Sequence, residues 1–142
     1  MNKIVLNNNE NFDGIINKII IDNDKKKTEI TIKQWNNKET YSLSILEFNN
    51  VIFQSLPDIS SFNLVTEITR KENINPVLKE LNEYFNNNSS LILSNTEDNI
   101  SRDINNLDCV QSYLFESGYC KDWLIICSDM NKKELNDVKS KD

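Results

Sequence analysis

Short apolar runs recur along the chain, separated by clusters of Asn, Asp, Lys and Ser. The first long run, Gly14 to Asp22, is too short and too rich in β-branched Ile to favour a helix, so it predicts a strand. Residues 28–35 alternate, with Ile30 and Ile32 on one face. Because residues 22–26 have the composition of a turn, the two runs predict a β-hairpin.

The rest of the chain holds further strand patterns. Residues 41–45 have the cleanest period-two alternation, which then slips by one residue at Leu46 and predicts a bulge or bend. Segments with strand-like composition also occur at residues 62–69, 91–93, 109–116 and 123–127. The last of these is continuously apolar, which indicates a strand in the interior of a sheet, joined to residues 109–116 as a hairpin.

One segment has helical spacing. Asn75 can cap, Pro76 suits the first helical position, and apolar residues recur from Val77 to Phe85, so we expect a helix over about 76–85. Residues 94–108 are polar and acidic, and they predict a loop in which one helical turn can form. Residues 131–142 are rich in Lys and Asp, and they predict a frayed charged tail or a short exposed helix.

These elements predict a mainly β fold of the α+β class. We expect one domain over residues 1–142, built as a twisted antiparallel sheet or β-sandwich with one main helix and a polar acidic loop. The length of 142 residues and the hydrophobic fraction of 38% suit a single core. Only 2 Gly are present, so we expect Asn, which tolerates the left-handed conformation, at turn positions where Gly is usual.

The net charge of −6 narrows the choice of partners. It disfavours direct binding to nucleic acid and to anionic membrane surfaces, both of which need clustered Lys and Arg. It suits a basic protein partner, whose approach an acidic surface accelerates, and it equally suits a role in solubility alone. The N-terminal residues lack the apolar run of a secretory signal, and no stretch is long and apolar enough to span a membrane, so we expect a cytoplasmic protein.

The sequence offers little for catalysis. His is absent, which removes the commonest general base and the commonest transition-metal ligand. Gly14 and Gly118 are isolated, whereas a phosphate-binding loop needs several Gly close together. Asp22-Asn23-Asp24 begins like a calcium loop, but Lys occupies its fifth and sixth positions. We therefore expect no catalytic residue, no metal site and no cofactor.

The three Cys residues do not form a recognisable disulfide or zinc pattern, because no CxxC spacing is present. Cys109 and Cys127 lie in strand-like runs, and we expect both to be buried as small apolar side chains. Cys120 follows the turn at Gly118, and we expect it to be the exposed thiol.

Four carboxylates in the polar segment are the candidate contacts for a partner: Glu97, Asp98, Asp103 and Asp108. Arg102 alone opposes them, and loops of this kind commonly carry binding function. The alternative is a solvated loop without a role. Trp35, beside the Asn36-Asn37 turn, is a further candidate because Trp is enriched at protein interfaces.

Several segments carry a resemblance to a known family. The resembling segments are Phe12–Ile16, Glu29–Ile32, Leu46–Val51, Asn63–Ile68, Tyr113–Glu116 and Trp123–Cys127, which are spread along residues 12–127. Their strand patterns resemble small β-rich bacterial immunity proteins of polymorphic-toxin and contact-dependent inhibition systems. The resemblance implies a cytoplasmic protein that binds and neutralises one cognate toxin domain, often a basic nuclease, and it brings no catalytic residues.

Two other functions stay open from the residues alone. One is a non-catalytic structural or adaptor domain of a bacterial or phage assembly. The other is a metal-dependent hydrolase that uses only Asp and Glu. For glycoside hydrolysis, no feature of the sequence selects a carboxylate pair. The oligomeric state is also left open.

Overall fold

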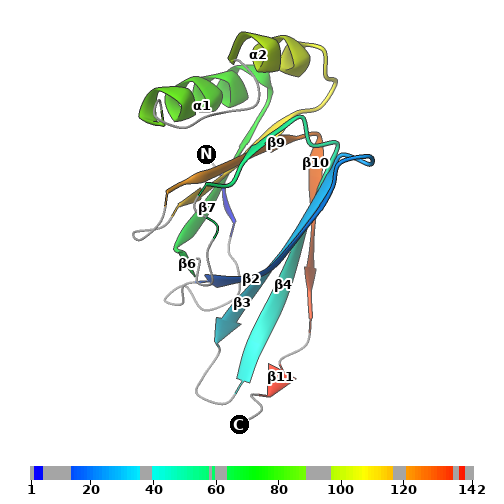
Figure 1. Ribbon diagram of the computed structural model, residues 1–142, viewed down its shortest axis with the longest axis vertical. Helices are drawn as coiled ribbons and strands as arrows, with labels where there is room; N and C mark the ends of the chain where they lie inside the picture. The colour runs from blue at the N-terminus through cyan, green and yellow to red at the C-terminus, as the bar shows by residue number, and fades with distance from the viewer. Residues whose placement is uncertain are drawn as a thin grey trace.

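Figure 1 shows the protein as a computed structural model, which describes residues 2–4, 14–35, 40–57, 59, 64–88, 97–116, 121–135 and 138–139. Its strands are β1 (Asn2–Ile4), β2 (Gly14–Asp22), β3 (Lys27–Trp35), β4 (Thr40–Asn49), β5 (Phe53–Ser55), β6 (Leu64–Val65), β7 (Glu67–Glu72), β8 (Gln111–Glu116), β9 (Trp123–Cys127), β10 (Asp129–Glu134) and β11 (Val138–Lys139). Its helices are α1 (Ile74–Asn87) and α2 (Glu97–Asn105).

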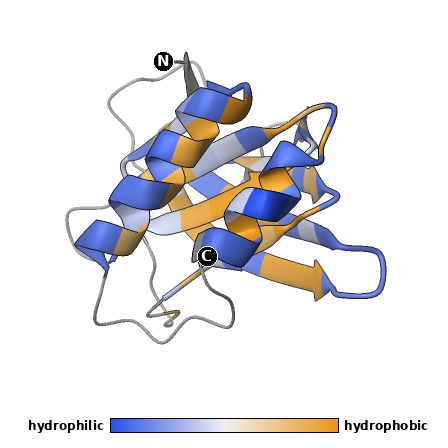
Figure 2. Ribbon diagram, turned by 90° about the horizontal axis from the view of Figure 1, so that it is seen from above, coloured by the Kyte–Doolittle hydropathy of each residue, from blue (hydrophilic) through white to orange (hydrophobic). Residues whose placement is uncertain are grey.

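The strands form two antiparallel sheets. The five-stranded sheet has the order β1-β7-β8-β9-β5, and the six-stranded sheet has the order β10-β4-β3-β2-β6, with β11 also paired to β4. The two helices lie over the five-stranded sheet, with their viewer-facing sides mostly hydrophilic in the view from above (Figure 2). The protein is thus a β-rich α+β fold, as the sequence predicts, arranged as helices, five-stranded sheet and six-stranded sheet.

The five-stranded sheet is covered on both faces, which explains why β9 is continuously apolar. Alternate side chains of a strand point to opposite faces. Trp123, Ile125 and Cys127 enter the cluster between the two sheets. Leu124 and Ile126 enter the cluster beneath the helices. All five residues are buried, and β9 has strands on both sides, which confirms the prediction of an interior strand.

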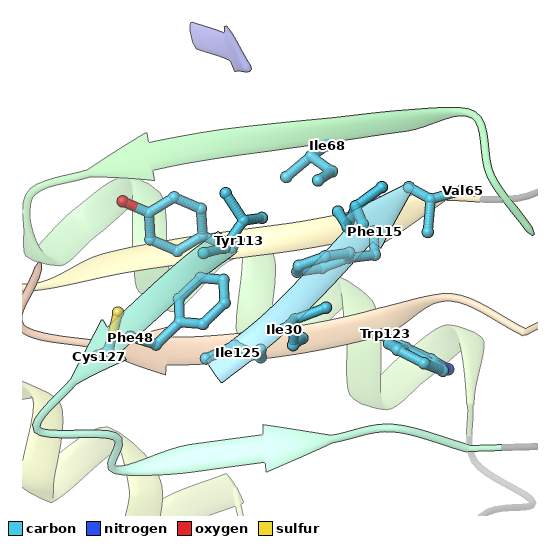
Figure 3. Close-up of a cluster of buried hydrophobic side chains, with 11 residues drawn as sticks. Ile30, Phe48, Val65, Ile68, Tyr113, Phe115, Trp123, Ile125 and Cys127 are labelled. Carbon is cyan, nitrogen blue, oxygen red and sulfur yellow. The ribbon is translucent and has the colours of Figure 1, made fainter. Parts of the chain in front are cut away.

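The core between the sheets is built from side chains of both. Figure 3 shows aromatic and Ile side chains from the five-stranded sheet meeting those of β3 and β4. Phe48 of β4 packs edge-on against Tyr113 of β8, with the ring centroids 5.1 Å apart. Each large apolar side chain buried here contributes about 1.5–3 kcal/mol.

The polar segment expected to be a loop over residues 94–108 contains a helix instead. Helix α2 covers Glu97–Asn105, and its buried side chains Ile100 and Ile104 pack in the cluster with α1. The prediction was wrong because two Ile residues four positions apart make a short apolar stripe that overall composition hides. The main helix expected over about 76–85 is confirmed as α1.

Residues 131–142 were expected to be a frayed tail or an exposed helix, and part of this segment forms strands. β10 pairs with β4, where Met130 lies opposite Phe48 and packs against the core, and β11 pairs with Thr40 and Tyr41. A polar strand at a sheet edge has little apolar alternation, so its sequence resembles that of a tail.

The slip in the pattern of β4 does not produce a bulge. β4 pairs with β3 without a register shift from Tyr41 to Phe48, because Ser44 continues the buried face and Ile45 belongs to the opposite one. The bulge lies in β2, between Ile16 and Lys18.

Asn does take turn positions that require positive φ. Asn50 has φ 52° and Asn73 has φ 74°, and the other non-Gly residue in this region among those described is Lys26 in the turn between β2 and β3. The strand expected at residues 91–93 lies outside the described residues.

Replacing Ile125 by Ala tests the core between the sheets. We expect the free energy of unfolding to fall by about 2–5 kcal/mol, because the variant leaves a cavity where both sheets pack. Urea denaturation measures the change. Ile59, which is 58% exposed, gives the matched control, and Ile59→Ala should change stability by less than about 0.5 kcal/mol. Equal effects of the two substitutions would contradict the packing described here.

Candidate protein-binding site

A polar hollow of about 760 Å³ lies where the end of β7, the first turn of α1, the end of α2 and the approach to β8 meet. We call it the polar hollow. It is lined by Glu72, Asn73, Ile74, Asn75, Pro76, Asn105, Asp108, Cys109, Val110 and Gln111.

The walls of the polar hollow are held by contacts between segments that are far apart in sequence. The backbone N–H of Asn73 donates to the carbonyl of Val110 at 3.3 Å, which joins the start of α1 to the approach to β8. Lys71 of β7 pairs with the buried carboxylate of Glu80 on α1, with Nζ 3.4 Å from Oε2. The helix therefore rests on the sheet in a defined position.

The other end of α1 is fixed by Tyr84. Its hydroxyl lies 2.9 Å from the backbone carbonyl of Asp122, to which it donates, and 2.8 Å from Oγ of Ser55. Burial raises the pKa of the Tyr84 hydroxyl, which keeps this donor neutral at physiological pH.

The lining of the polar hollow is acidic and rich in amides. It contains the carboxylates of Glu72 and Asp108, and no Lys or Arg is among the described residues that line it. Arg70 offsets one of these charges, because its Nε lies 3.5 Å from Glu72 Oε1. Asp108 is exposed and makes no ion pair with any of the described residues. The polar hollow therefore carries negative charge.

Four side-chain amides and an apolar wall complete the polar hollow. The amides belong to Asn73, Asn75, Asn105 and Gln111, and the apolar wall to Ile74, Pro76 and Val110. Lys and Arg place an apolar stem on such a wall and a charged head in hydrogen-bonding range of carboxylates and amide oxygens. The arrangement is thus suited to a basic side chain of a partner.

A second hollow of about 550 Å³ lies next to the first and has the opposite charge. It shares Glu72, Asn73, Asn75 and Pro76 with the polar hollow, and Arg70, Lys71 and Lys79 also line it. Adjacent negative and positive hollows favour a partner with the complementary order of charges and disfavour others.

Asn73 has a strained backbone at the rim of both hollows. Its φ of 74° and ψ of 156° lie in a region that residues with a Cβ rarely adopt, and no side-chain hydrogen bond caps α1 there. Such a conformation costs about 1–3 kcal/mol and is found most often at functional sites. The strain therefore supports a binding role for this end of α1.

The structure does not gather the predicted contact residues at one place. Asp108 lines the polar hollow, whereas Asp98 is exposed on α2, one turn before Arg102, and Asp103 is half-buried. Glu97 is the first residue of α2, and its side chain lies outside the described part of the chain.

Trp35, the other candidate, is the last residue of β3 and lies opposite Tyr41 in the sheet, but its side chain also falls outside what the structure describes. Glu72, Asn105 and Gln111 also line the polar hollow, and none of them was predicted from the sequence as a contact residue. Glu72 lies just before the start of the predicted helix, and this position was the one feature of the sequence that could have marked it as a binding residue.

The thiols differ in part from expectation. Cys109 is exposed at the rim of the polar hollow, because β8 begins only at Gln111 and leaves Cys109 in a bend. Cys127 is buried as expected, and burial, with a smaller effect from Asp129, raises the pKa of its thiol. Cys120 lies outside the described residues.

Three further findings bear on function. Within the described ranges, no group of three or more Cys, Asp or Glu is arranged to hold a metal ion. Neither described helix combines the length and the apolar character needed to cross a membrane. Comparison with protein-family models, with curated proteins and with solved structures found no match.

Replacing Asn73 by Gly tests the strain at the start of α1. We expect the variant to be more stable by about 1 kcal/mol, because Gly adopts this conformation without the steric cost of a Cβ. Asn75→Gly, two residues later within the helix, should instead lose a few tenths of a kcal/mol. Urea denaturation of both variants measures the difference, and destabilisation by Asn73→Gly would show that the conformation is unstrained.

Proposed function

We propose that this protein is a cytoplasmic immunity protein that binds one basic bacterial toxin domain and neutralises it without catalysis. The polar hollow is the contact site, and it receives a Lys or Arg side chain of the toxin. The observation that carries the proposal is the placement of Glu72 and Asp108 in one hollow beside amides and an apolar wall. The resemblance of the strand patterns to immunity proteins supports the same function.

Electrostatics support a basic partner over a neutral one. The positive end of the α1 dipole amounts to roughly half an elementary charge. The two carboxylates of the polar hollow exceed this positive charge, and because Arg70 offsets Glu72, the negative charge of Asp108 remains there. The positive charge of Lys79 belongs to the adjacent hollow. The whole chain carries a net charge of −6, so a basic domain is attracted at long range before the short-range contacts form.

The position of the polar hollow supports inhibition by coverage. Its walls come from α1, α2, β7 and β8, which are packed elements, so little order has to be created when a partner binds. A toxin active site that binds nucleic acid is itself lined by basic side chains. In this proposal the polar hollow engages such a side chain, and the protein then covers the active site.

Reversing the charge of the polar hollow tests the proposal. The double variant Glu72→Lys/Asp108→Lys should bind the cognate toxin domain, to be sought among the genes beside this one, at least about tenfold more weakly, because like charges then face the partner. Isothermal titration with the purified toxin domain measures the affinity, and growth of cells that express both proteins measures neutralisation. The wild type should rescue growth, and the double variant should not.

The matched control is Glu83→Lys, an exposed carboxylate near the other end of α1. It should bind and rescue like the wild type. Asp98→Lys tests whether the outer side of α2 contributes to binding, and it should also leave the affinity for the toxin nearly unchanged. Rescue by the double variant, with the affinity of the wild type, would show that the polar hollow is not part of the contact site. Failure of the wild type to bind the toxin domain or to rescue growth would refute the proposed function itself.

A second candidate function is a non-catalytic structural or adaptor domain of a bacterial or phage assembly. The outer face of the six-stranded sheet favours it, because Tyr41, Leu43 and Ile45 lie half-buried there beside charged residues of β3. None of the other described elements forms a layer over this face. A partner that binds there would be insensitive to Glu72→Lys/Asp108→Lys.

A further inference from the structure

β2 has an open edge in the six-stranded sheet. Along one side it pairs with β3, from Ile15 to Asp22. On its other side β6 pairs only with Gly14 and Ile15. Lys18–Asp22 therefore has no strand on that side among the described residues, so alternate backbone N–H and C=O groups point outward from the sheet.

The open edge also exposes apolar side chains. Ile20 and Ile21 are each 44% exposed, whereas Ile19 is half-buried against the core between the sheets. β-branched residues are the best strand formers, and no Pro or Gly interrupts this stretch. Such an edge readily accepts a further strand.

The other edges are less suited to pairing. At the opposite edge of the same sheet, β10 consists of polar and charged residues apart from Met130. The edges of the five-stranded sheet, β1 and β5, have three residues each. Charged and very short edge strands are the usual means by which proteins prevent unwanted pairing. The edge of β2 lacks both kinds of protection between Lys18 and Asp22.

The order of residues on this edge is self-complementary. The stretch reads Lys18-Ile19-Ile20-Ile21-Asp22, with the apolar residues between opposite charges. If two copies pair antiparallel with Ile20 opposite Ile20, Lys18 of each copy lies opposite Asp22 of the other. Parallel pairing in register would instead place Lys opposite Lys and Asp opposite Asp, which is unfavourable.

The faces of the strand agree with this pairing. Lys18, Ile20 and Asp22 pair with Thr31, Glu29 and Lys27 of β3, so all three belong to the outer face of the sheet. The two ion pairs would then flank the central Ile20 contact on one face. Ile19 would lie opposite Ile21 on the inner face and cover its exposed surface.

We propose that the edge of β2 is a homodimer interface, in which a second copy of this chain adds its own β2 antiparallel and continues the six-stranded sheet through a two-fold axis. Two-fold symmetry requires a surface patch that is complementary to itself, and the charge order of this stretch meets that requirement. Asp22 can take part because the hydrogen bond that it accepts within the turn, from the Lys25 N–H at 3.2 Å, uses one carboxylate oxygen, Oδ1.

The length of the edge sets the strength of the dimer. β6 limits the free edge at Gly14 and Ile15, and the turn at residues 23–26 limits it beyond Asp22. About five residues from each copy therefore pair, and an interface of this size falls below the ~1,200 Å² of stable complexes. The dimer is consequently weak and depends on protein concentration. It uses none of the residues of the polar hollow, so it stands independently of the proposed immunity function.

Sedimentation equilibrium of the full chain tests the dimer. We expect the wild type to self-associate. Lys18→Asp or Asp22→Lys should weaken association at least about tenfold, because each substitution places like charges at both positions where residue 18 of one copy faces residue 22 of the other. A 1:1 mixture of the two variants should associate again, since the heterodimer restores both opposite-charge pairs. A wild type that stays monomeric up to millimolar concentration would overturn the proposal, as would a mixture that does not associate.

Two controls keep the test independent of folding defects. Ile20→Lys changes a side chain already exposed in the monomer and leaves the turn intact, so it should fold normally and be monomeric. Lys133→Asp makes the same charge change as Lys18→Asp at an exposed position on β10, and it should associate like the wild type. Thermal melting confirms that each variant is folded. Undiminished association of Ile20→Lys would refute the interface.

Discussion

The burial of both faces of the five-stranded sheet is the constraint on which the rest of the structure depends. β9 has no solvent-exposed side, so its Trp123, Ile125 and Cys127 must be matched by one layer and its Leu124 and Ile126 by another. The six-stranded sheet supplies the first layer and the two helices supply the second. Because each fully buried large side chain contributes about 1.5–3 kcal/mol, loss of either layer would expose more apolar surface than a domain of marginal stability can tolerate.

The candidate surfaces follow from this layering. Helices α1 and α2 are held against the five-stranded sheet, and the polar hollow opens where their ends meet the ends of β7 and β8. The six-stranded sheet has its inner face in the core and its outer face uncovered by the other described elements, so its strands alternate in polarity. Its edge at β2 is open because β6 pairs only with the first two residues of that strand. Opposite layers thus offer two different surfaces, one acidic and concave and one a strand edge.

The sequence predicted those elements whose pattern is local. The β2–β3 hairpin, α1 and β9 were predicted because alternation, helical spacing or a continuous apolar run marks each of them within a few residues. Helix α2 was missed because two Ile residues carry its whole apolar face, and β10 was missed because a polar edge strand resembles a tail. In both cases the structure comes from tertiary pairing, which overrides local composition.

The candidate site was predictable only in part, for a related reason. Asp108 was predicted as a contact residue, but its neighbour in the polar hollow, Glu72, is distant in sequence. The hydrogen bond between Asn73 and Val110 brings the two segments together, and no pattern in the sequence announces it. The four candidate carboxylates were predicted on a loop, whereas Asp98 lies on α2, away from the buried Ile100. Of those carboxylates whose side chains the structure describes, Asp108 lines the polar hollow.

Native-state hydrogen exchange tests most directly whether the five-stranded sheet is the shared layer. The amides of β9 and of the buried face of α1 should exchange only through global unfolding, with equal free energies and equal dependence on denaturant, because both layers depend on that sheet. In the monomer, below the concentration at which β2 pairs with a second copy, the amides of β2 that face its open edge should exchange by local opening at much lower free energy. Exchange of β9 by local opening, or release of α1 well below the global free energy, would contradict the account.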